Sequence, residues 1–340
     1  MSKLKILFVG LGSIGQRHLR NLREILKRRD DTGSIYALRS LPLRELPSEA
    51  EAALDGQFSS YDELPRDFTH IFITNPTSYH YKTLLRLLPC APCFFVEKPL
   101  FELPDFTLPD LKDKVVYTAC PLRYTALLRR MQEYVSSHRV IAARAICSSY
   151  LPAWRPQSDY RQSYSARKEL GGGVALDLIH EWDYLTWLFG MPLDLKSYRA
   201  KLSDLDIDTE DCAVYIARYA DKLVSLHLDY FGRRARRELE LYTDSEVVRG
   251  DFITGEIQHS DGTVISVKED RDVSQRAELE YFLSLKPGLP NANPPELALE
   301  VLRLTLGRPL KAEAACSGPD PDCACAAATD NSPTGQSPHQ

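Results

Sequence analysis

The sequence has no long apolar run and no strong excess of one charge. Among its 340 residues, no uninterrupted apolar stretch approaches the roughly 20 residues that a bilayer-spanning helix needs. The 42 Lys and Arg residues nearly balance the 47 Asp and Glu residues, so the formal charge of -5 gives no reason to expect nucleic acid or an anionic membrane as a partner. We therefore expect a soluble protein that acts on small molecules.

The sequence also shows no disulfide framework and no secretory signal. Its eight cysteines are scattered along a chain too long to need disulfide staples, so reduced thiols in a cytoplasm fit better. Cys90-x-x-Cys93 lacks the helix or the second thiol pair that redox or zinc chemistry requires, and we interpret it as chance spacing. The apolar stretch behind Lys3 and Lys5 is short and is broken by glycines, unlike a signal peptide. We therefore expect a cytoplasmic protein without a metal site.

The length of the chain is enough for two domains. The segment 4–9, in which residues 6–9 are continuously apolar, is typical of a strand buried on both faces, and a helix with an arginine-rich outer face follows it. The pattern then alternates, with strands at 34–38, 58–61, 70–74 and 93–96 and a helix at 79–88. This alternation predicts a doubly wound parallel sheet, so we expect an α/β protein whose N-terminal Rossmann domain spans residues 1–120.

From about residue 140 the pattern changes to strands separated by turns. The strand-like segments are 140–150, 195–202, 213–218, 223–231, 237–242, 246–252, 256–259 and 264–267, with helices at 175–189, 274–285 and 295–306. They predict a C-terminal α+β domain over 121–310 with an open, mainly antiparallel sheet. Residues 311–340 contain almost no large apolar side chain, so we expect a disordered tail, and its three cysteines lack the paired spacing of a zinc site.

The strand at 4–9 ends in the turn Gly10-Leu11-Gly12-Ser13-Ile14-Gly15, which opens the first helix. A G-x-G-x-x-G sequence in this context indicates dinucleotide binding. Gly10 permits the tight turn, Gly12 lets the pyrophosphate approach the backbone, and Gly15 allows the helix to pack closely. With Ser13 and Ile14, these glycines form the expected phosphate site at the helix N-terminus. The alternative is a purely structural glycine turn.

The end of the second predicted strand bears on the choice of cofactor. Leu38 is followed by Arg39 and Ser40, where an NAD enzyme usually has an acidic residue for the ribose hydroxyls. A cation and a hydroxyl favour NADP over NAD, because they suit a 2′-phosphate that an acid would repel. In the alternative interpretation, Arg39 projects into solvent or stacks on adenine, and the protein uses either cofactor.

Two polar segments follow later strands, at the sheet edge where doubly wound folds bind ligands. They are Asn75-Pro76-Thr77…His80 and Glu97-Lys98-Pro99, and a third segment downstream reads Gly171-Gly172-Gly173…Asp177…His180…Asp183. Together with the glycine turn, these motifs resemble the Gfo/Idh/MocA oxidoreductases, which include glucose-fructose oxidoreductase and inositol dehydrogenase. The resemblance covers about residues 3–306.

The resemblance implies roles for the first two polar segments. Lys98 would lie beside the nicotinamide and the reacting hydroxyl as a catalytic residue, with Glu97 at the nicotinamide-binding edge. Asn75, Pro76 and His80 would be cofactor contacts. A lysine with a lowered pKa would suit proton exchange at neutral pH. In the alternative interpretation, Lys98 is a surface lysine that follows a strand.

The resemblance also implies that His180 acts as an acid or base and that Asp177 orients it or binds a sugar hydroxyl. Imidazole suits this task because its ordinary pKa is near neutral pH. Two residues separate Asp177 from His180, where common family members have three. On one regular helix this difference turns one side chain by about 100°. The alternative is a structural histidine paired with Asp183.

Five residues are candidate substrate contacts, because aromatic faces and arginine forks suit a sugar that carries a carboxylate or phosphate. Arg123 and Tyr124 match an arginine–aromatic pair of the family. Trp154, Arg155 and Tyr164 lie in the long loop before the triple glycine. For each of the five, packing under a loop is the alternative.

These observations predict reversible hydride transfer between NAD(P) and a secondary alcohol carbon of a sugar, cyclitol or nucleotide-sugar. The loop at 154–171 and the helix from His180 resemble family members found with surface-glycan and sialic-acid-like sugar pathways. The arginine run at 233–237 is either a solvated strand face or a contact to a nucleotide-sugar phosphate. The alternatives are a non-catalytic dinucleotide sensor, which retention of Lys98 and His180 disfavours, and a biliverdin-type reductase. We expect a homo-oligomer, either a dimer or a tetramer.

Overall fold

The computed structural model describes residues 3–39 and 45–308, which belong to one compact unit. Two sheets form within this unit, one before and one after residue 120. The boundary between two domains at that residue stays a prediction. Ser40 and the predicted disordered tail lie outside the described residues.

The first sheet has six parallel strands in the order β3-β2-β1-β4-β5-β6. Its strands are β1 (Lys5–Val9), β2 (Ser34–Leu38), β3 (Gly56–Phe58), β4 (His70–Ile73), β5 (Cys93–Val96) and β6 (Val115–Thr118). The direction of winding reverses between β1 and β4, which creates a ligand-binding crevice at the carboxyl ends of these strands. The predicted doubly wound parallel sheet is therefore confirmed.

Two strands of this sheet differ from the prediction. The third strand ends at Phe58 instead of running to Tyr61, because the Ser60 hydroxyl accepts a hydrogen bond from the Asp62 amide and starts a short turn. The sixth strand, β6, is an addition that the alternation in the sequence did not reveal. It extends the sheet beyond β5 and brings Thr118 close to the ligand-binding edge.

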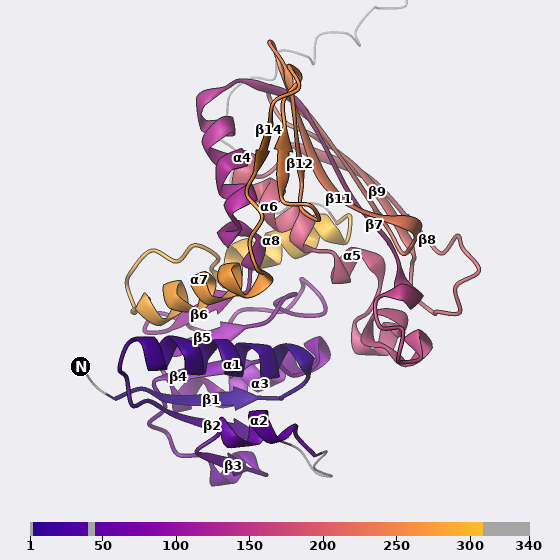
Figure 1. The fold of residues 1–340 in the computed structure, drawn as a ribbon. Coiled ribbons are helices and arrows are strands. Elements are labelled where there is room, and N and C mark those ends of the chain that lie inside the picture. Colours follow the sequence, from indigo (N-terminus) through magenta and orange to yellow (C-terminus); the bar gives the residue numbers. More distant parts are fainter. Residues whose placement is uncertain (1–2, 40–44, 309–340) are drawn as a thin grey trace, which may run out of the picture. The chain divides into compact units, whose positions relative to one another are not determined.

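The helices of the first sheet include one from the far end of the chain. Near in sequence are α1 (Ser13–Arg28), α2 (Ser48–Ala52) and α3 (His80–Leu87). The distant helix α7 (Arg271–Ser284) packs beside α1, as Figure 1 shows. Its Phe282 ring lies 5.4 Å from the rings of both Phe72 and Phe95, in the same core cluster as the apolar side of α1. A segment expected in the second domain thus helps to bury the first sheet.

The second sheet has eight strands in the order β14-β13-β12-β11-β7-β10-β9-β8. Its strands are β7 (Val140–Tyr150), β8 (Asp194–Ala200), β9 (Cys212–Arg218), β10 (Leu223–Asp229), β11 (Phe231–Thr243), β12 (Val247–Asp251), β13 (Glu256–Gln258) and β14 (Val264–Ser266). Only β7 and β10 pair in parallel among these strands, so the predicted mainly antiparallel sheet is confirmed.

Helices cover one face of the second sheet. They are α4 (Ala126–Ser137), α5 (Val174–Asp177), α6 (His180–Phe189) and α8 (Pro295–Thr305). On α6 the buried Trp182 ring meets Tyr215 of β9 edge-on at 5.4 Å. The opposite face leaves large apolar side chains open, since Tyr198 is 83% exposed and Ile216 is 54% exposed. The sheet is therefore open on one side, as the alternating sequence pattern predicts.

A buried carboxyl group joins α7 to the first sheet. Glu278 is fully buried, and its Oε1 accepts hydrogen bonds from the Cys120 amide at 2.5 Å and from the Tyr117 hydroxyl at 3.0 Å. Its Oε2 has no partner among the described residues. Burial raises the pKa of Glu278 from its ordinary value of 4.5 to about 8.

This raised pKa makes stability depend on pH. The contribution of such a carboxyl group is fully present below pH 4.5 and is lost as the pH rises through about 8. Glu278→Gln mimics the protonated form, so we expect it to flatten the fall in unfolding temperature over this range. Each pKa unit is worth about 1.4 kcal/mol, so the rise from 4.5 to about 8 puts the gain near pH 8 on the order of 5 kcal/mol.

Thermal unfolding followed by circular dichroism across this pH range measures the effect. Glu280→Gln, on the partly exposed side of the same helix, is the matched control and should keep the wild-type pH dependence. An unchanged pH profile in Glu278→Gln would show that Glu278 is ionised in the folded protein.

Candidate active site

The glycine turn after β1 leaves space at the start of α1. Gly10 has φ +87°, and a Cβ there would lie 2.8 Å from the Asn75 backbone. A Cβ on Gly15 would lie 2.7 Å from the Gly10 carbonyl oxygen, whereas a Cβ on Gly12 would meet nothing within 4 Å. Gly12 therefore borders open space, which a pyrophosphate group would fill.

The first turn of α1 is suited to an anion. Ser13 begins the helix and is exposed, Ile14 is half-buried, and no side chain caps the helix from Gly12. The first turn also contains no acidic residue. Uncapped backbone N–H groups and the helix dipole then face the space beside Gly12, and both favour a phosphate group.

The segment after β4 contributes a polar atom to the same edge. Asn75 donates a hydrogen bond from Nδ2 to the Thr83 hydroxyl at 2.9 Å, while its buried Oδ1 has no partner among the described residues. Pro76 follows it and leads into a short turn at Thr77–Tyr79. An unpaired buried amide oxygen beside the glycine turn is expected where a ligand supplies the missing donor. These residues therefore fit a bound dinucleotide.

His80 supports this edge from behind. It is 1% exposed, and its Nε2 lies 2.8 Å from the Asn75 carbonyl oxygen while its Nδ1 lies 3.1 Å from the Pro99 carbonyl oxygen. Burial lowers the pKa of His80. Because the imidazole has almost no free surface, the direct contact of His80 with the cofactor stays a prediction. His80 joins the turn after β4 to the turn after β5.

Arg39 directly follows β2, and its Nη1 donates a hydrogen bond to Gln57 Oε1 at 3.0 Å. This pairing places the guanidinium at the edge of β3, next to the position where an acidic residue is absent from the sequence. The contact to a 2′-phosphate stays a prediction.

The turn after β5 is tightly held. Glu97 is 9% exposed, with its carboxylate 2.5 Å from His18 Nε2 and bonded to the Lys98 amide at 3.1 Å. Although burial opposes ionisation, these partners hold the pKa of Glu97 below its ordinary value. The Lys98–Pro99 peptide bond is cis. Glu97 therefore anchors the turn and leaves the Lys98 side chain to face the ligand-binding edge.

Lys98 reaches across to the segment that precedes α6. Its Nζ donates a hydrogen bond to the Asp177 carbonyl oxygen at 2.7 Å and lies 3.6 Å from Asp177 Oδ1. Only 20% of the Lys98 side chain and 15% of the Asp177 side chain are exposed. Two residues that are 79 positions apart in the sequence are thus in direct contact.

The helix predicted over 175–189 is broken in the structure. Asp177 ends α5, His180 begins α6, and Leu178 between them leaves the helical conformation with φ -97° and ψ 25°. The short spacing between Asp177 and His180 therefore does not fix their relative direction as it would on one helix. The prediction of a continuous helix was wrong, and the break lets both residues face the same region.

Two partners that the sequence did not reveal hold the Asp177 carboxylate. Its Oδ2 accepts a hydrogen bond from the Ser165 hydroxyl at 2.5 Å and another from the Tyr230 hydroxyl at 3.0 Å. No motif links these residues, because Tyr230 is 53 positions away in the chain. The carboxylate is consequently fixed in one orientation, with Oδ1 left toward Lys98.

His180 lies in a cationic environment. It lines a small cavity together with Lys98, Thr118 and Asp183. Burial lowers the pKa of His180 well below its ordinary value, and the positive charges of Lys98, Arg237 and Arg271 lower it further. The imidazole is therefore neutral near pH 7 and can accept a proton.

The alternative pairing of His180 with Asp183 is not formed. Asp183 instead accepts two hydrogen bonds from Arg123, at 2.9 Å from Nε and 2.6 Å from Nη2. Arg123 is 4% exposed, so these contacts enclose its guanidinium, and its role as a substrate contact stays a prediction. Tyr124 likewise bonds to the Tyr117 hydroxyl at 3.1 Å and lies apart from the other substrate candidates.

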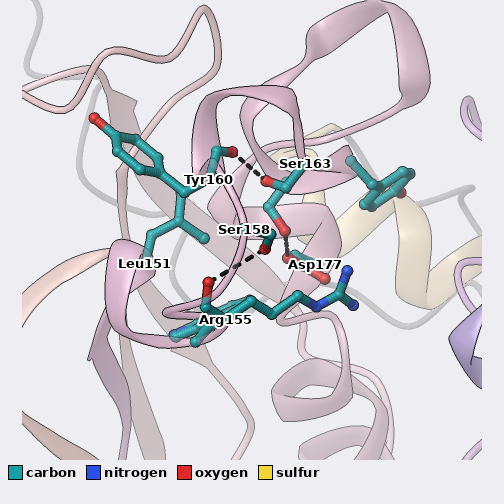
Figure 2. Close-up of a pocket in the computed structure, with 9 residues that line it drawn as sticks. Leu151, Arg155, Ser158, Tyr160, Ser163 and Asp177 are labelled. Carbon is teal, nitrogen blue, oxygen red and sulfur yellow. Dashed lines mark hydrogen bonds between the residues drawn. The ribbon is translucent and has the colours of Figure 1, made fainter.

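The remaining three substrate candidates come together with Asp177. Trp154, Arg155 and Tyr164 line one cavity of about 130 Å³, and Asp177 forms part of its wall. Figure 2 shows Arg155 and Asp177 at this cavity. The Tyr164 hydroxyl donates a hydrogen bond to the Gly171 carbonyl oxygen at 2.6 Å, which ties the loop to the triple glycine. We refer to this space, enclosed by residues 151–177, as the loop cavity.

Most of the arginine run at 233–237 is paired. Arg237 contacts the buried Glu181 at 2.5 Å, Arg236 contacts Glu238 at 2.8 Å, and the Arg233 guanidinium stacks 3.7 Å from the Tyr150 ring centre. The pairing of Arg237 and Arg236 makes them parts of the folded sheet.

Cys90 and Cys93 are free and buried, and burial raises the pKa of the Cys93 thiol to about 11. Within residues 3–39 and 45–308, no His, Cys, Asp and Glu side chains gather in a group that could hold a metal ion. The helices in those ranges are also too short or too polar to cross a bilayer.

Two family descriptions match consecutive parts of the chain. The description "Oxidoreductase family, NAD-binding Rossmann fold" matches residues 4–115, and "GFO/IDH/MocA C-terminal domain" matches residues 128–249. No curated protein matches the chain.

Solved structures share the fold over nearly their whole length. UDP-N-acetylglucosamine 3-dehydrogenase from Acidithiobacillus ferrooxidans is 17% identical, with 90% of this chain and 97% of that chain covered and a TM-score of 0.68. Myo-inositol 2-dehydrogenase from Lactobacillus plantarum is 17% identical, with 90% of this chain and 96% of that chain covered and a TM-score of 0.66. Levoglucosan dehydrogenase in complex with NADH and L-sorbose is 17% identical, with 90% of this chain and 95% of that chain covered and a TM-score of 0.73. At these identities the likeness establishes the fold.

The charges around His180 make a testable difference to its titration. Arg271→Gln removes one of the cations that lower the pKa of His180, so this pKa should rise. If neutral His180 accepts a proton in catalysis, the acidic limb of the profile of kcat/KM against pH moves to higher pH. The control is Arg276→Gln, which removes another cation of α7, one that is bound to Glu24 of α1. This variant should leave the limb in place. A limb that does not move in Arg271→Gln contradicts the assignment to His180.

Proposed function

Since the chain belongs to the Gfo/Idh/MocA family of oxidoreductases and has its NAD-binding Rossmann domain, we propose that it transfers a hydride to or from a secondary alcohol carbon of a sugar, cyclitol or nucleotide-sugar. The observation that carries this proposal is the contact of Lys98 with Asp177, beside His180, at the carboxyl edge of the first sheet. This edge is where a nicotinamide would lie in a doubly wound fold. We also propose that this reaction serves surface-glycan biosynthesis.

The three residues divide the work of alcohol oxidation. When bound, the cofactor takes the hydride from the carbon. The hydroxyl proton passes to His180, which is neutral at working pH and has room to accept it, and a carbonyl group remains on the substrate. In the reverse direction the protonated imidazole returns this proton. No other oxidant is needed, because the hydride carries both electrons.

Lys98 binds the substrate oxygen in this proposal. An ammonium group has three N–H donors, and the described contacts use one for the Asp177 carbonyl oxygen at 2.7 Å. A second donor faces Asp177 Oδ1 at 3.6 Å, and the third is available for the reacting oxygen. A positive charge beside that oxygen stabilises the negative charge that develops as the proton leaves. Ser165 and Tyr230 hold Asp177, so the ammonium group is also held.

We further propose that the protein is a cytoplasmic homo-oligomer, a dimer or tetramer, that associates through the open face of the second sheet. The support is the exposure of Tyr198 and Ile216 on that face. Large apolar side chains grouped on an uncovered sheet are typical of association surfaces.

The catalytic assignment is tested with two variants. Lys98→Met and His180→Asn should each lower turnover at least about 100-fold, because the first removes the charge that stabilises the developing oxyanion and the second removes the general base. Both should still bind the dinucleotide, since neither lies at the glycine turn. The measurement is a spectrophotometric screen of NAD(P)H oxidation and NAD(P)⁺ reduction over sugars, cyclitols and nucleotide-sugars. Lys112→Met, an exposed lysine, is the control and should keep wild-type activity.

Full activity in Lys98→Met would refute the mechanism. Tight binding of the dinucleotide without turnover of any compound would favour the sensor over the enzyme. Turnover confined to a conjugated double bond would favour the biliverdin-type reductase.

We also propose that NADP is preferred, with Arg39 as the contact to the 2′-phosphate. Arg39→Ala should then lower kcat/KM for NADPH at least about 10-fold while NADH changes little, since an arginine–phosphate contact is a charge-assisted pair. Arg29→Ala removes an exposed cation at the opposite end of α1 and is the control. A wild-type protein that uses NADH far better than NADPH contradicts this assignment.

A further inference from the structure

The loop cavity belongs to the substrate side of the site. All of its lining residues come from the chain between the end of β7 and the end of α5, and none comes from the first sheet. Its volume of about 130 Å³ is several times the roughly 30 Å³ share of one water molecule, and far less than a dinucleotide needs. The cavity can therefore take part of a small substrate while the cofactor lies elsewhere.

Asp177 connects the loop cavity with the reaction centre. Its carboxylate lines the cavity, while its Oδ1 and carbonyl oxygen face Lys98. A substrate whose reacting oxygen lies at Lys98 would therefore extend past Asp177 toward the loop. Figure 2 shows Arg155, Ser158, Ser163 and Asp177 arranged around the same space.

Arg155 is the one cation among the residues that line the loop cavity, and its side chain has no hydrogen-bond or ion-pair partner among the described residues. Arg161 pairs with Asp159 at 2.8 Å, and Arg167 donates to the Arg161 carbonyl oxygen at 2.9 Å. The hydrogen bonds of Arg155 involve its backbone carbonyl oxygen, which accepts from the Ser158 hydroxyl at 3.2 Å and from the Ser158 amide at 3.0 Å. Its guanidinium lines the cavity with its planar fork of N–H donors unused, and this fork suits a carboxylate or a phosphate.

The wall beside Arg155 suits a sugar ring. Trp154 is 39% exposed, its Nε1 donates to the Ser149 hydroxyl at 2.8 Å, and its ring meets Tyr230 edge-on at 5.4 Å. These contacts fix the indole plane and leave a face open for the C–H groups of a sugar. The Ser163 hydroxyl donates to the Tyr160 carbonyl oxygen at 2.6 Å and can still accept a bond from a sugar hydroxyl.

We propose that the loop cavity binds an anionic substituent of the sugar, a carboxylate or a phosphate, and that Arg155 determines this specificity. The inference rests on the proposed function, since it names the class of sugar that is oxidised or formed. Asp177 is the one acidic residue that lines the cavity, and the Lys98 ammonium 3.6 Å away offsets its charge. An anion in the cavity would therefore contact the Arg155 guanidinium directly, and the Lys98 charge would reduce its repulsion by the Asp177 carboxylate.

The test compares neutral and anionic forms of one sugar. Steady-state kinetics with glucose, glucuronate, glucose 1-phosphate and UDP-glucose, each as alcohol substrate with NADP⁺ and NAD⁺, give kcat and KM separately. We expect at least one anionic form to exceed the neutral sugar in kcat/KM. Arg155→Gln should raise KM for that form at least about 10-fold with little change in kcat, because the guanidinium does not touch the reacting atoms.

The control is Arg66→Gln, which removes an exposed arginine that lies before β4 and does not line the cavity. It should leave all KM values within about two-fold, whereas in wild type added salt should raise KM for the anionic form alone. The glucuronate and phosphate arms show which anion the site takes.

Three outcomes overturn the inference. One is a preference for the neutral sugar, and another is an equal effect of Arg155→Gln on neutral and anionic forms, which indicates a structural role. In both cases turnover persists and the proposed function stands. The third is no turnover of any sugar despite dinucleotide binding, in which case the proposed function and the inference fail together.

Discussion

The site depends on one contact, between the Lys98 ammonium and both the carbonyl and the carboxylate of Asp177. Each partner is fixed from its own side. Glu97 and His18 hold the turn that carries Lys98, and Ser165 and Tyr230 hold the carboxylate of Asp177. Because these supports are buried or partly buried hydrogen bonds to charged groups, they are stronger than ordinary surface pairs. The ammonium group is thereby positioned before any substrate arrives, which removes part of the entropic cost of catalysis.

The chemistry of His180 follows from its surroundings. Burial and three nearby cations lower the pKa of His180, so its imidazole is neutral near pH 7, which is the form that the proposed proton transfer requires. A neighbouring carboxylate would raise the pKa of the histidine. The two acidic residues that follow it on α6 are paired elsewhere, because Asp183 binds Arg123 and Glu181 binds Arg237. In the proposed mechanism, these two buried ion pairs would act through electrostatics, since each neutralises a carboxylate that would otherwise stabilise the imidazolium ion.

The sequence predicted those features that depend on residues close together in the chain. The turn from Gly10 to Gly15 needs a tight bend and a close approach of backbone, and only glycine permits both, so its place and role were readable. The packing of Phe282 against Phe72 was not readable, because nothing near α7 shows which sheet it covers. Lys98, Asp177 and His180 were candidates from motifs, but Ser165, Tyr230 and the break at Leu178 depend on contacts between distant segments.

The pairing of arginines separates structural from binding roles, which their positions in the sequence could not do. Arg123 and Arg237 each face a buried carboxylate, and an unpaired carboxylate there would be costly, so these two guanidinium groups complete the fold. Arg155 faces a cavity, and its guanidinium forms no ion pair with a carboxylate in the described part of the chain. A guanidinium left without a partner beside an oriented indole and a fixed aspartate gains most from a ligand that brings its own negative charge. Among the arginines that the sequence offered as substrate contacts, Arg155 is therefore the one to which the proposal assigns the anion.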